Sequence, residues 1–338
     1  MKNILITGGA GYIGSHVCEV LINKKKNLFI VDNLSTGFKK LINKKALFYN
    51  LNILNTKKLK KIINKKKIDT IIHLAASLSI GIGEKNPKFY YQNNVSGTKS
   101  LLKACNNSLV KNFIFSSTAA VYEEGQKIVS EKSKINPKSV YGKTKLLAEK
   151  NIILDCKKMK INYGILRFFN VCGASISGKI GIISEGDHLF KNLSIEVMKK
   201  KPTIKIYGND YNTLDGTAIR DFIHVSDLAE VHYRVLRNIF KTKKSKIINC
   251  GYNRGLSVKQ VVEEFKNQIK QKMNIKFQSR RPGDMEMLIA NNKYLKKLIN
   301  WKPKHNNLAN IVRSCIRWEK KLTLNSLRIK QIVPSRKK

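Results

Sequence analysis

Residues 3–16 read NILITGGAGYIGSH, and this stretch predicts how the chain folds. The apolar run at its start predicts a strand over residues 3–7, and the periodicity of residues 13–23 predicts a helix. The turn between them carries three glycines, three residues apart, at Gly8, Gly11 and Gly14. Such glycines permit a tight turn, let the backbone approach a pyrophosphate and allow close packing, while the helix N-terminus favours an anion. The stretch therefore predicts the opening of a dinucleotide-binding fold. A glycine turn that binds no phosphate is the alternative.

The second predicted strand, residues 28–31, ends at Asp32, which lies 18 residues after Gly14. A carboxylate at this place can accept hydrogen bonds from the hydroxyls of an adenosine ribose. It would repel the 2′-phosphate of NADP, so we expect NAD as the cofactor.

Apolar strands and helical segments alternate along the rest of the first half, as in βαβ units. Strands are predicted at residues 70–74, 112–116 and 163–168, and helices from about 91 to 105 and over 141–157. We therefore predict an α/β fold, a Rossmann-like doubly wound parallel sheet with a smaller C-terminal α+β substrate-binding part.

The regular alternation loosens after about residue 175, where we expect shorter elements. We assign residues 1–175 to an NAD-binding part, with a strand and helix contributed from about 215–252. Residues 176–322 form mainly the substrate-binding part of this interpretation. Residues 323–338 form a basic tail, which we expect to be frayed from residue 328.

The formal net charge of +44, from 66 Lys and Arg against 22 Asp and Glu, raises the question of a polyanionic partner. The basic residues occur throughout the chain, and no zinc-finger, RNP-like or aromatic-interleaved basic segment is present. We interpret the charge as compositional and expect no specific nucleic-acid partner. The opposite hypothesis, a polyanion binder, predicts binding to random nucleic acid that weakens steeply with salt.

The sequence contains no apolar run of the roughly 20 residues that a membrane helix needs. Its N-terminal run lacks the longer apolar core and the cleavage site of a secretion signal. The six cysteines lie far apart, without CxxC pairs or matching histidine spacing, which argues against a disulfide framework and a zinc site. We expect a cytoplasmic protein with no membrane contact and no metal.

Tyr141 and Lys145 stand four residues apart in SVYGKTK, residues 139–145, on one face of a predicted helix. Chance predicts about 2.3 such pairs (12 tyrosines × 66/338), and the chain has three, so the pair needs support. Thr118 supplies it, because this residue follows a predicted strand at the edge where α/β sheets bind ligands. A nearby ammonium and a positive nicotinamide ring would lower the phenol pKa from about 10. The group then suits proton removal from a secondary alcohol whose hydride leaves for NAD.

With these residues, the chain resembles the extended short-chain dehydrogenase/reductase superfamily and, within it, the UDP-glucose 4-epimerase family. The resemblance covers about residues 1–320. It rests on TGGAGYIGSH, DNLSTG (32–37), HLAA (73–76), PKFYYQNNVSGT (87–98), SSTAAVY, YGKTK, LRFFN (166–170) and above all GNDYNTLDGTAIRDFIHVSDLA (208–229). That last stretch is the most specific, because other members of the superfamily keep only scraps of it.

The resemblance implies a catalytic group in which Tyr141 is the base, Lys145 assists it and binds the nicotinamide ribose, and Thr118 hydrogen-bonds the reacting oxygen. It also implies sites for NAD and for a UDP-hexose. The implied cofactor residues are Gly8, Gly11, Tyr12, Ile13, Gly14, Asp32, Asn33, Asn52, Ile53, Asn93, Ser116, Tyr141, Lys145 and Phe169. The implied substrate residues are Thr118, Asn170, His188, Leu189, Arg220, Arg281 and Asp284. A surface ion pair is the alternative for the two arginines.

Several positions depart from the family's pattern. Asn52 stands where an Asp usually contacts the adenine amine, although its side-chain oxygen can accept the same bond. Leu78 stands where some members have a lysine, Glu123 replaces a usual Gly, and Val171-Cys172 replace Pro-Val or Pro-Ala. These departures concern how tightly NAD is held rather than the catalytic group.

The residues after Thr118 select the reaction. Related 4,6-dehydratases have Asp-Glu there, and decarboxylating relatives usually have the Glu, whereas this chain has Ala119 and Ala120. The reaction that remains is oxidation at C4, rotation of the 4-keto sugar and return of hydride to its other face. The resemblance therefore implies interconversion of UDP-galactose and UDP-glucose.

Two alternatives stay open. The first is another UDP-sugar 4-epimerase, which acts on UDP-N-acetylglucosamine or UDP-glucuronate. It stays open because Leu288, a residue of intermediate size, aligns with the position that restricts the family's pocket to plain hexoses. A catalytically silent NAD-binding sensor is the second, although such proteins typically lose the Tyr or the Lys. The family commonly dimerises through the helix that bears Tyr141 and the one before it, so we expect a homodimer.

Overall fold

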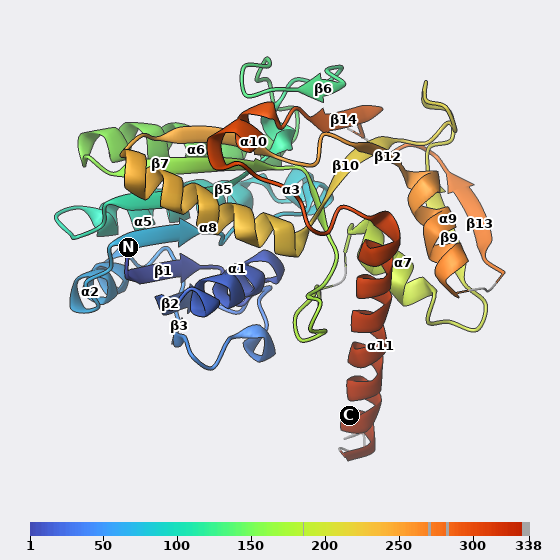
Figure 1. Cartoon of the computed structure of the whole chain (residues 1–338), viewed down its shortest axis with the longest axis horizontal. Coiled ribbons are helices and arrows are strands. Elements are labelled where there is room, and N and C mark those ends of the chain that lie inside the picture. Colours follow the sequence, from blue (N-terminus) through green and yellow to red (C-terminus); the bar gives the residue numbers. More distant parts are fainter. Residues whose placement is uncertain (185, 270–271, 282–283, 333–338) are drawn as a thin grey trace.

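The computed structural model describes residues 1–184, 186–269, 272–281 and 284–332, without the side chains of residues 325–332. Its main sheet has seven strands in the order β11-β7-β5-β4-β1-β2-β3 (Figure 1). These are β1 (Asn3–Thr7), β2 (Asn27–Asp32), β3 (Leu47–Asn50), β4 (Thr70–His73), β5 (Asn112–Thr118), β7 (Asn162–Phe168) and β11 (Lys246–Cys250). Every adjacent pair is parallel. The strand order reverses beside β1, so the predicted doubly wound parallel sheet is confirmed.

Helices cover both faces of this sheet. On one face α1 (Tyr12–Asn23) packs on α8 (Val225–Thr242), and on the other α5 (Gly97–Cys105) packs between α2 (Thr56–Lys65) and α6 (Val140–Lys158). Alternate side chains of a strand point to opposite faces of the sheet. In β1, Ile4 and Ile6 therefore join the core beneath α1 and α8, whereas Leu5 joins the core beneath the other three helices.

A smaller part lies beside the carboxyl ends of the main strands (Figure 1). Its central strand β10 (Ile219–His224) pairs with β12 (Gly255–Ser257), β14 (Met287–Ala290) and β8 (Asn170–Cys172), and β14 also pairs with β6 (Ile128–Val129). A parallel pair, β9 (Thr203–Tyr207) with β13 (Asn274–Gln278), and the helices α7 (Leu189–Glu196) and α9 (Val258–Ile269) complete it. Because β6 and β8 precede residue 175, both sides of that boundary build this sheet. The division into 1–175, 176–322 and 323–338 stays our interpretation.

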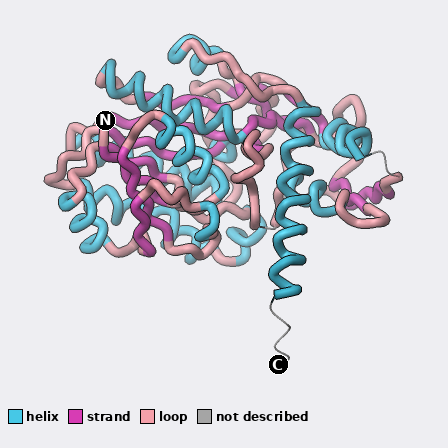
Figure 2. Tube along the Cα trace, turned by 60° about the horizontal axis from the view of Figure 1, so that its bottom comes forward, coloured by secondary structure: helices cyan, strands magenta, loops and turns pink. Residues whose placement is uncertain are grey.

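The shorter helices are η1 (Lys39–Leu41), α3 (Ile80–Lys85), α4 (Pro87–Tyr90), the π-helix η2 (Tyr91–Ser96), η3 (Ala119–Val121) and α10 (Lys293–Ile299). The last helix, α11 (Leu308–Ile332), is 25 residues long, and its C-terminal part extends past the rest of the chain (Figures 1 and 2). The expectation of shorter elements after residue 175 is wrong for α11, and the expected fraying from residue 328 is wrong as far as Ile332. The helix continues because residues 308–332 contain no Gly or Pro. Residues 333–338 lie outside the described residues.

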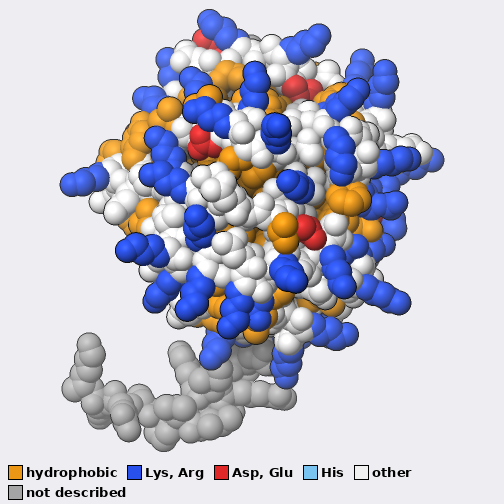
Figure 3. Space-filling model, turned by 90° about the vertical axis from the view of Figure 1, so that its left-hand side faces the viewer, with side chains coloured by type: hydrophobic (Ala, Val, Ile, Leu, Met, Phe, Trp, Pro, Cys, Tyr) orange, Lys and Arg blue, Asp and Glu red, His pale blue; other side chains and the backbone are white. Residues whose placement is uncertain are grey.

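The basic side chains are spread over the surface rather than gathered on one element. On the face in Figure 3, Lys and Arg side chains are scattered among hydrophobic and other side chains, and Asp and Glu are few. Within the described residues, no helix is long and apolar enough to cross a membrane, and no group of three His, Cys, Asp or Glu could hold a metal. The six cysteines are buried and unpaired.

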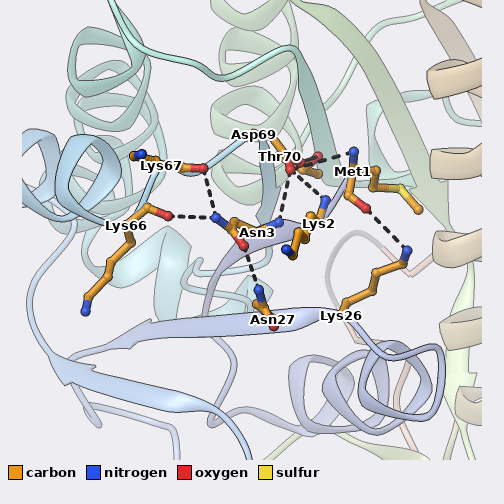
Figure 4. A network of polar contacts seen from close by, with 9 residues as sticks. All are labelled: Met1, Lys2, Asn3, Lys26, Asn27, Lys66, Lys67, Asp69 and Thr70. Atoms are coloured by element: carbon orange, nitrogen blue, oxygen red, sulfur yellow. Dashed lines mark hydrogen bonds and ion pairs between the residues drawn. The ribbon is translucent and has the colours of Figure 1, made fainter.

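A hydrogen-bond network aligns the N-terminal ends of the central strands (Figure 4). The Asp69 carboxylate, just before β4, accepts bonds from the backbone N–H groups of Lys2 (2.6 Å) and Asn3 (3.0 Å). The Asn3 amide donates to the carbonyls of Lys66 and Lys67, and Asn27 at the start of β2 donates to Asn3 Oδ1. Because β1, β2 and β4 are fixed in register at this edge, their carboxyl ends also lie level.

Candidate active site

The glycine turn after β1 leaves no space for side chains. A Cβ on Gly14 would lie 2.1 Å from the Gly8 carbonyl oxygen, and Gly8 itself has a φ of +74°. The α1 N-cap, Gly11, has no side-chain hydrogen bond to the first turn, so backbone N–H groups of α1 remain available to an anion. Tyr12 and Ile13 begin the helix. This arrangement fits the pyrophosphate of a dinucleotide.

Asp32 stands at the end of β2, next to this turn. Its Oδ2 accepts a hydrogen bond from Ala10 N (3.0 Å) and its Oδ1 one from Leu34 N (2.9 Å), which fix the carboxylate against the glycine loop. Asn33 is exposed, and its Oδ1 accepts a bond from Ser35 N (3.1 Å). A ribose hydroxyl can still donate to a carboxylate, because each oxygen carries more than one lone pair.

The segment after β3 reaches the same edge, because Asp32 and Asn50 are paired residues of β2 and β3. Asn52 Oδ1 accepts a hydrogen bond from Leu54 N (2.9 Å), so the oxygen expected to face the adenine amine is already engaged. Ile53 is buried and lies so close to Gly97 that a Cβ there would be 2.5 Å from it. The structure thus brings Asp32, Asn33, Asn52 and Ile53 to one edge of the sheet.

The π-helix η2 presents Asn93, whose Nδ2 donates to Ser77 Oγ (2.9 Å). Its neighbour Asn94 is buried and bonds to three groups: its Oδ1 accepts from Ser77 N (2.8 Å), and its Nδ2 donates to Ser77 O and Thr144 Oγ1 (both 3.1 Å). Asn94 therefore ties the loop after β4 to α6, beside Lys145. Sequence reasoning missed Asn94 and Ser77, although π-turns often occur at functional sites.

The candidate catalytic residues lie where β5 ends and α6 begins. Thr118 is the last residue of β5, and Tyr141 and Lys145 lie on the first two turns of α6. Burial raises the pKa of Tyr141 to about 12, although a hydrogen bond with Thr118 opposes the rise. Ser116 and Phe169, expected near the cofactor, are buried on β5 and just after β7.

Lys145 is 2% exposed, and its Nζ lies 4.2 Å from the centroid of the Phe115 ring. Burial lowers the pKa of Lys145 to about 7, and the charge of Glu149 opposes that shift. We expected the Lys145 ammonium to lower the pKa of Tyr141 below its ordinary value. In the structure the pKa of Tyr141 is raised instead, because burial disfavours the charged forms of both side chains.

The expected substrate-side residues lie at the starts of β8, α7 and β10 and in the segment before β14. Asn170 is exposed at the start of β8, and Leu189 begins α7. His188 uses both ring nitrogens within the protein, since Nε2 lies 2.7 Å from Val171 O and Nδ1 accepts from Lys191 N (3.4 Å). The Tyr12 hydroxyl donates to Gly173 O at 2.6 Å, so the start of α1 is held against this region.

Arg220, Arg281 and Asp284 lie together. Arg220 Nη2 is 3.1 Å from Asp284 Oδ1, and the Arg281 guanidinium lies 4.1 Å from the centroid of the Tyr207 ring. The Asp284 N–H donates to the Arg281 carbonyl (3.1 Å). Two guanidinium groups arranged in this way can bind a diphosphate bidentately. Leu288 pairs with Arg220 across the sheet and shares a core with Ala119 and Phe169, which connects this group to the catalytic end of β5.

Sequence reasoning missed a neighbouring pair of stacked side chains. The Arg280 guanidinium lies 4.2 Å from the Tyr211 ring centroid and its Nε is 2.8 Å from Asp210 Oδ1. Tyr211 and Asp210 belong to the specific stretch at 208–229, which was the available signal.

A groove of about 680 Å³ beside α11 contains none of the catalytic or arginine residues above. Three of its eleven described lining residues are basic, Arg313, Arg317 and Lys320. The chain's composition predicts about two (11 × 66/338), so the groove is not enriched in basic residues.

Comparison with known proteins gives the family. The chain matches the NAD-dependent epimerase/dehydratase family over residues 4–251, which is most of its length. The chain belongs to this family. As a member it is an NAD-dependent enzyme, and the glycine turn and Asp32 described above fit that cofactor.

Similar proteins cover nearly the whole chain. The UDP-glucose 4-epimerase of Lactobacillus helveticus is 37% identical over 319 residues, which are 94% of this chain and 97% of the relative. A UDP-glucose 4-epimerase from Stenotrophomonas maltophila, solved with NAD and formylated UDP-arabinopyranose, superimposes with a TM-score of 0.92 at 29% identity, over 96% and 100% of the two chains. The UDP-Glc/GlcNAc 4-epimerase of Campylobacter jejuni has a TM-score of 0.83 at 35% identity, over 95% and 100%. The predicted resemblance is confirmed.

Proposed function

We propose that this family member is a UDP-glucose 4-epimerase, which interconverts UDP-galactose and UDP-glucose. The observation that carries the proposal is the junction of β5 and α6, where Thr118, Tyr141 and Lys145 meet. Two alanines, Ala119 and Ala120, directly follow Thr118. Ala119 and Ala120 provide neither acid nor base, so the site can move one proton and cannot catalyse elimination of water. The similarity to UDP-glucose 4-epimerases over the whole chain supports the same activity.

In the proposed mechanism Tyr141 removes the proton of the sugar C4 hydroxyl and later returns it. Thr118 donates a hydrogen bond to the same oxygen, and the Lys145 ammonium stabilises the phenolate. NAD, held by the glycine turn and the nicotinamide-side residues, would supply a reversible hydride acceptor for C4, so that hydride could return to the opposite face of the rotated sugar. Proton and hydride both return to the sugar, so the cycle needs no second substrate.

The remaining expected residues take binding roles in this proposal. The glycine turn with Tyr12 and Ile13 would hold the pyrophosphate of NAD, Asp32, Asn33, Asn52 and Ile53 the adenosine, and Asn93, Ser116, Lys145 and Phe169 the nicotinamide half. Arg220 and Arg281 would bind the substrate diphosphate, and Asp284 would hold Arg220 in place before the substrate binds. Asn170, His188 and Leu189 would complete the uridine side, where engagement of both His188 nitrogens favours contact through its backbone.

Conversion of UDP-galactose by the purified protein tests the proposal, with the product sugar separated by chromatography. Tyr141→Phe is expected to lower kcat by about 10²- to 10⁴-fold, because it removes the general base. Tyr233→Phe is the matched control, since Tyr233 on α8 also has a basic residue, Arg237, four places on. Bound NAD without conversion of any UDP-sugar would instead favour the silent sensor.

A panel of UDP-sugars separates the remaining alternative. The Campylobacter jejuni relative is described as acting on both UDP-Glc and UDP-GlcNAc, so a member of this fold can accept an acetamido sugar. Leu288 is 6% exposed on β14 and its intermediate size leaves this open. We propose the plain hexoses as the preferred substrates, and equal kcat/KM for UDP-N-acetylglucosamine would overturn that preference.

We also propose a cytoplasmic homodimer. Leu147 and Leu154, seven residues apart on α6, are 38% and 53% exposed, and Tyr91 on the preceding helix is 37% exposed. Leu147 and Leu154 lie on one side of α6, and Tyr91 begins η2, which leads directly into α5. The family commonly dimerises through these two helices. Leu154→Glu is expected to shift the protein to monomers in sedimentation equilibrium, whereas unchanged mass would contradict this interface.

A further inference from the structure

A buried polar group lies one helical turn after Lys145. Glu149 is four residues further along α6, and both side chains are 2% exposed. Arg167 on β7 donates to both oxygens of the Glu149 carboxylate, from Nε at 3.1 Å and from Nη2 at 2.7 Å. Such two-point pairing is the strong form of an Arg–carboxylate contact and fixes the orientation of both groups.

The same carboxylate also holds the end of β5. Ser117 Oγ donates a short hydrogen bond to Glu149 Oε1, and Ser117 directly precedes Thr118. One side chain therefore connects the strand that ends in Thr118 with the helix that carries Tyr141 and Lys145. Because Thr118 and Tyr141 must reach one substrate oxygen, the spacing of this strand and helix sets the reactive geometry.

The hydrogen-bond network continues from Arg167 away from the proposed active site. Arg167 Nη1 donates to the Tyr122 hydroxyl (3.1 Å), which donates to Asn249 Oδ1 on β11 (2.6 Å). Asn249 Nδ2 donates to Val129 O on β6 (3.0 Å). Side chains from β5, α6, β7 and β11 are thereby locked together, and a buried network of this kind tolerates little displacement.

Glu149 is also the negative charge next to Lys145. The ammonium also lies against the Phe115 ring on β5, and it acts on His73 of β4, whose pKa burial and the Lys145 charge lower to about 3. Arg167 on β7 adds a positive charge bound to the same carboxylate. Burial lowers the pKa of Lys145, and the charge of Glu149 raises it.

We propose that Glu149 is a positioning residue for this reaction, which fixes Thr118 relative to Tyr141 and places a negative charge beside the Lys145 ammonium. It acts through these residues and touches neither substrate nor cofactor. The inference rests on the proposed function.

Glu149→Gln tests it, because glutamine keeps the length and an acceptor oxygen for Ser117 but removes the charge. We expect kcat for UDP-galactose to fall about 100-fold, as for misplaced catalytic groups, with KM changed less than about twofold. Without the carboxylate the Lys145 pKa falls, so the loss of kcat on the alkaline side is expected at lower pH than in the wild type. The matched control is Glu230→Gln, which removes the same charge from a Glu–Arg pair on α8 (2.9 Å to Arg234) and should keep the wild-type kcat and pH profile.

Ser117→Ala is the second variant, because it leaves the Glu149–Arg167 pair intact and removes only the link to β5. It should fold normally and lose about tenfold in kcat with unchanged KM. The unfolding midpoint and the NAD retained after gel filtration are measured for every variant. If Glu149→Gln unfolds or loses NAD, Ser117→Ala decides.

Wild-type kcat in folded Glu149→Gln, or in Ser117→Ala where that variant decides, overturns the proposal. A wild-type protein that converts no UDP-galactose overturns the proposed function instead, so the two failures are distinguishable.

Discussion

Tyr141 and Lys145 show how burial acts on the proposed catalytic pair. Burial raises the pKa of the phenol to about 12 and lowers that of the amine to about 7, so it disfavours phenolate and ammonium alike. Only groups that favour the charged forms can oppose this, and the structure identifies two, the Thr118 hydroxyl for Tyr141 and the Glu149 carboxylate for Lys145. The supporting groups are thus as much a part of the pair as its spacing.

Gly14 gives the sharpest prediction at this scale. In Gly14→Ala the new methyl would lie 2.1 Å from the Gly8 oxygen and 2.8 Å from the Gly9 Cα, both backbone atoms, so the turn must shift. We expect a loss of at least about 1–3 kcal/mol in the free energy of unfolding and loss of NAD retention. Urea denaturation and the absorbance of retained cofactor measure both.

Gly81→Ala is the control for Gly14→Ala. This helical glycine of α3 has no atom within 4 Å of its added Cβ, so alanine should stabilise the protein by about 0.5–1 kcal/mol. Retention of NAD by Gly14→Ala at the wild-type level would show that the turn does not approach the pyrophosphate.

At the scale of elements, the N-terminus of α6 determines where Tyr141 lies. Ser139 caps the helix, with its Oγ accepting from Gly142 N (3.1 Å), and Glu84 of α3 accepts from Val140 N (2.7 Å). Two of the first-turn N–H groups are therefore satisfied from outside the helix. Tyr141 lies between these two contacts, so fraying of this turn would displace the phenol.

Ser139→Ala is expected to lower the free energy of unfolding by about 1 kcal/mol, the usual cost of a lost cap, and to lower kcat as well. Asn307→Ala removes an equivalent cap before α11, where Asn307 Oδ1 accepts from Asn310 N (3.0 Å). It should cost similar stability and leave kcat unchanged. Equal kcat in the two variants would separate the cap from catalysis.

At the scale of the whole molecule, buried histidines make stability depend on pH. Burial lowers the pKa to about 4 for His16 and His232 and to about 3 for His73 and His224. The folded state holds these rings neutral, whereas the unfolded chain protonates them below about pH 6.5. The free energy of unfolding is therefore full above pH 6.5 and falls as the pH drops towards 4.

Each such histidine contributes up to about 1.4 kcal/mol per pH unit in that window. His232→Leu, at a fully buried position on α8, should make the fall between pH 6.5 and 4.5 shallower by up to that amount. Urea denaturation of both proteins at several pH values gives the slopes. Identical slopes would mean that His232 is protonated in the folded state.

The sequence anticipated the elements whose signal is local. β1, the glycine turn, α1 and Asp32 lie within 32 residues, and their pattern gave the strand, the turn, the helix and the cofactor class. The short strands β6 and β8 were harder to predict, since they pair with β14 and β10, which lie far along the chain. Two- and three-residue strands carry no periodicity of their own, so only their partners define them. The length of α11 was also missed, because the basic composition of residues 328–338 favoured a tail, although residues 308–332 contain no Gly or Pro.

By itself, the sequence determined the βαβ order and the glycine turn, and it predicted Tyr141, Lys145 and Thr118 as the candidate catalytic group, because these depend on residue type and on local spacing. Only the tertiary structure decided what surrounds that group. Glu149, Ser117, Arg167 and Asn249 are far apart in the chain, and no local pattern marks them as partners. They meet because parallel strands align their carboxyl ends, and once water is excluded there, each buried polar atom needs a partner that the fold must supply.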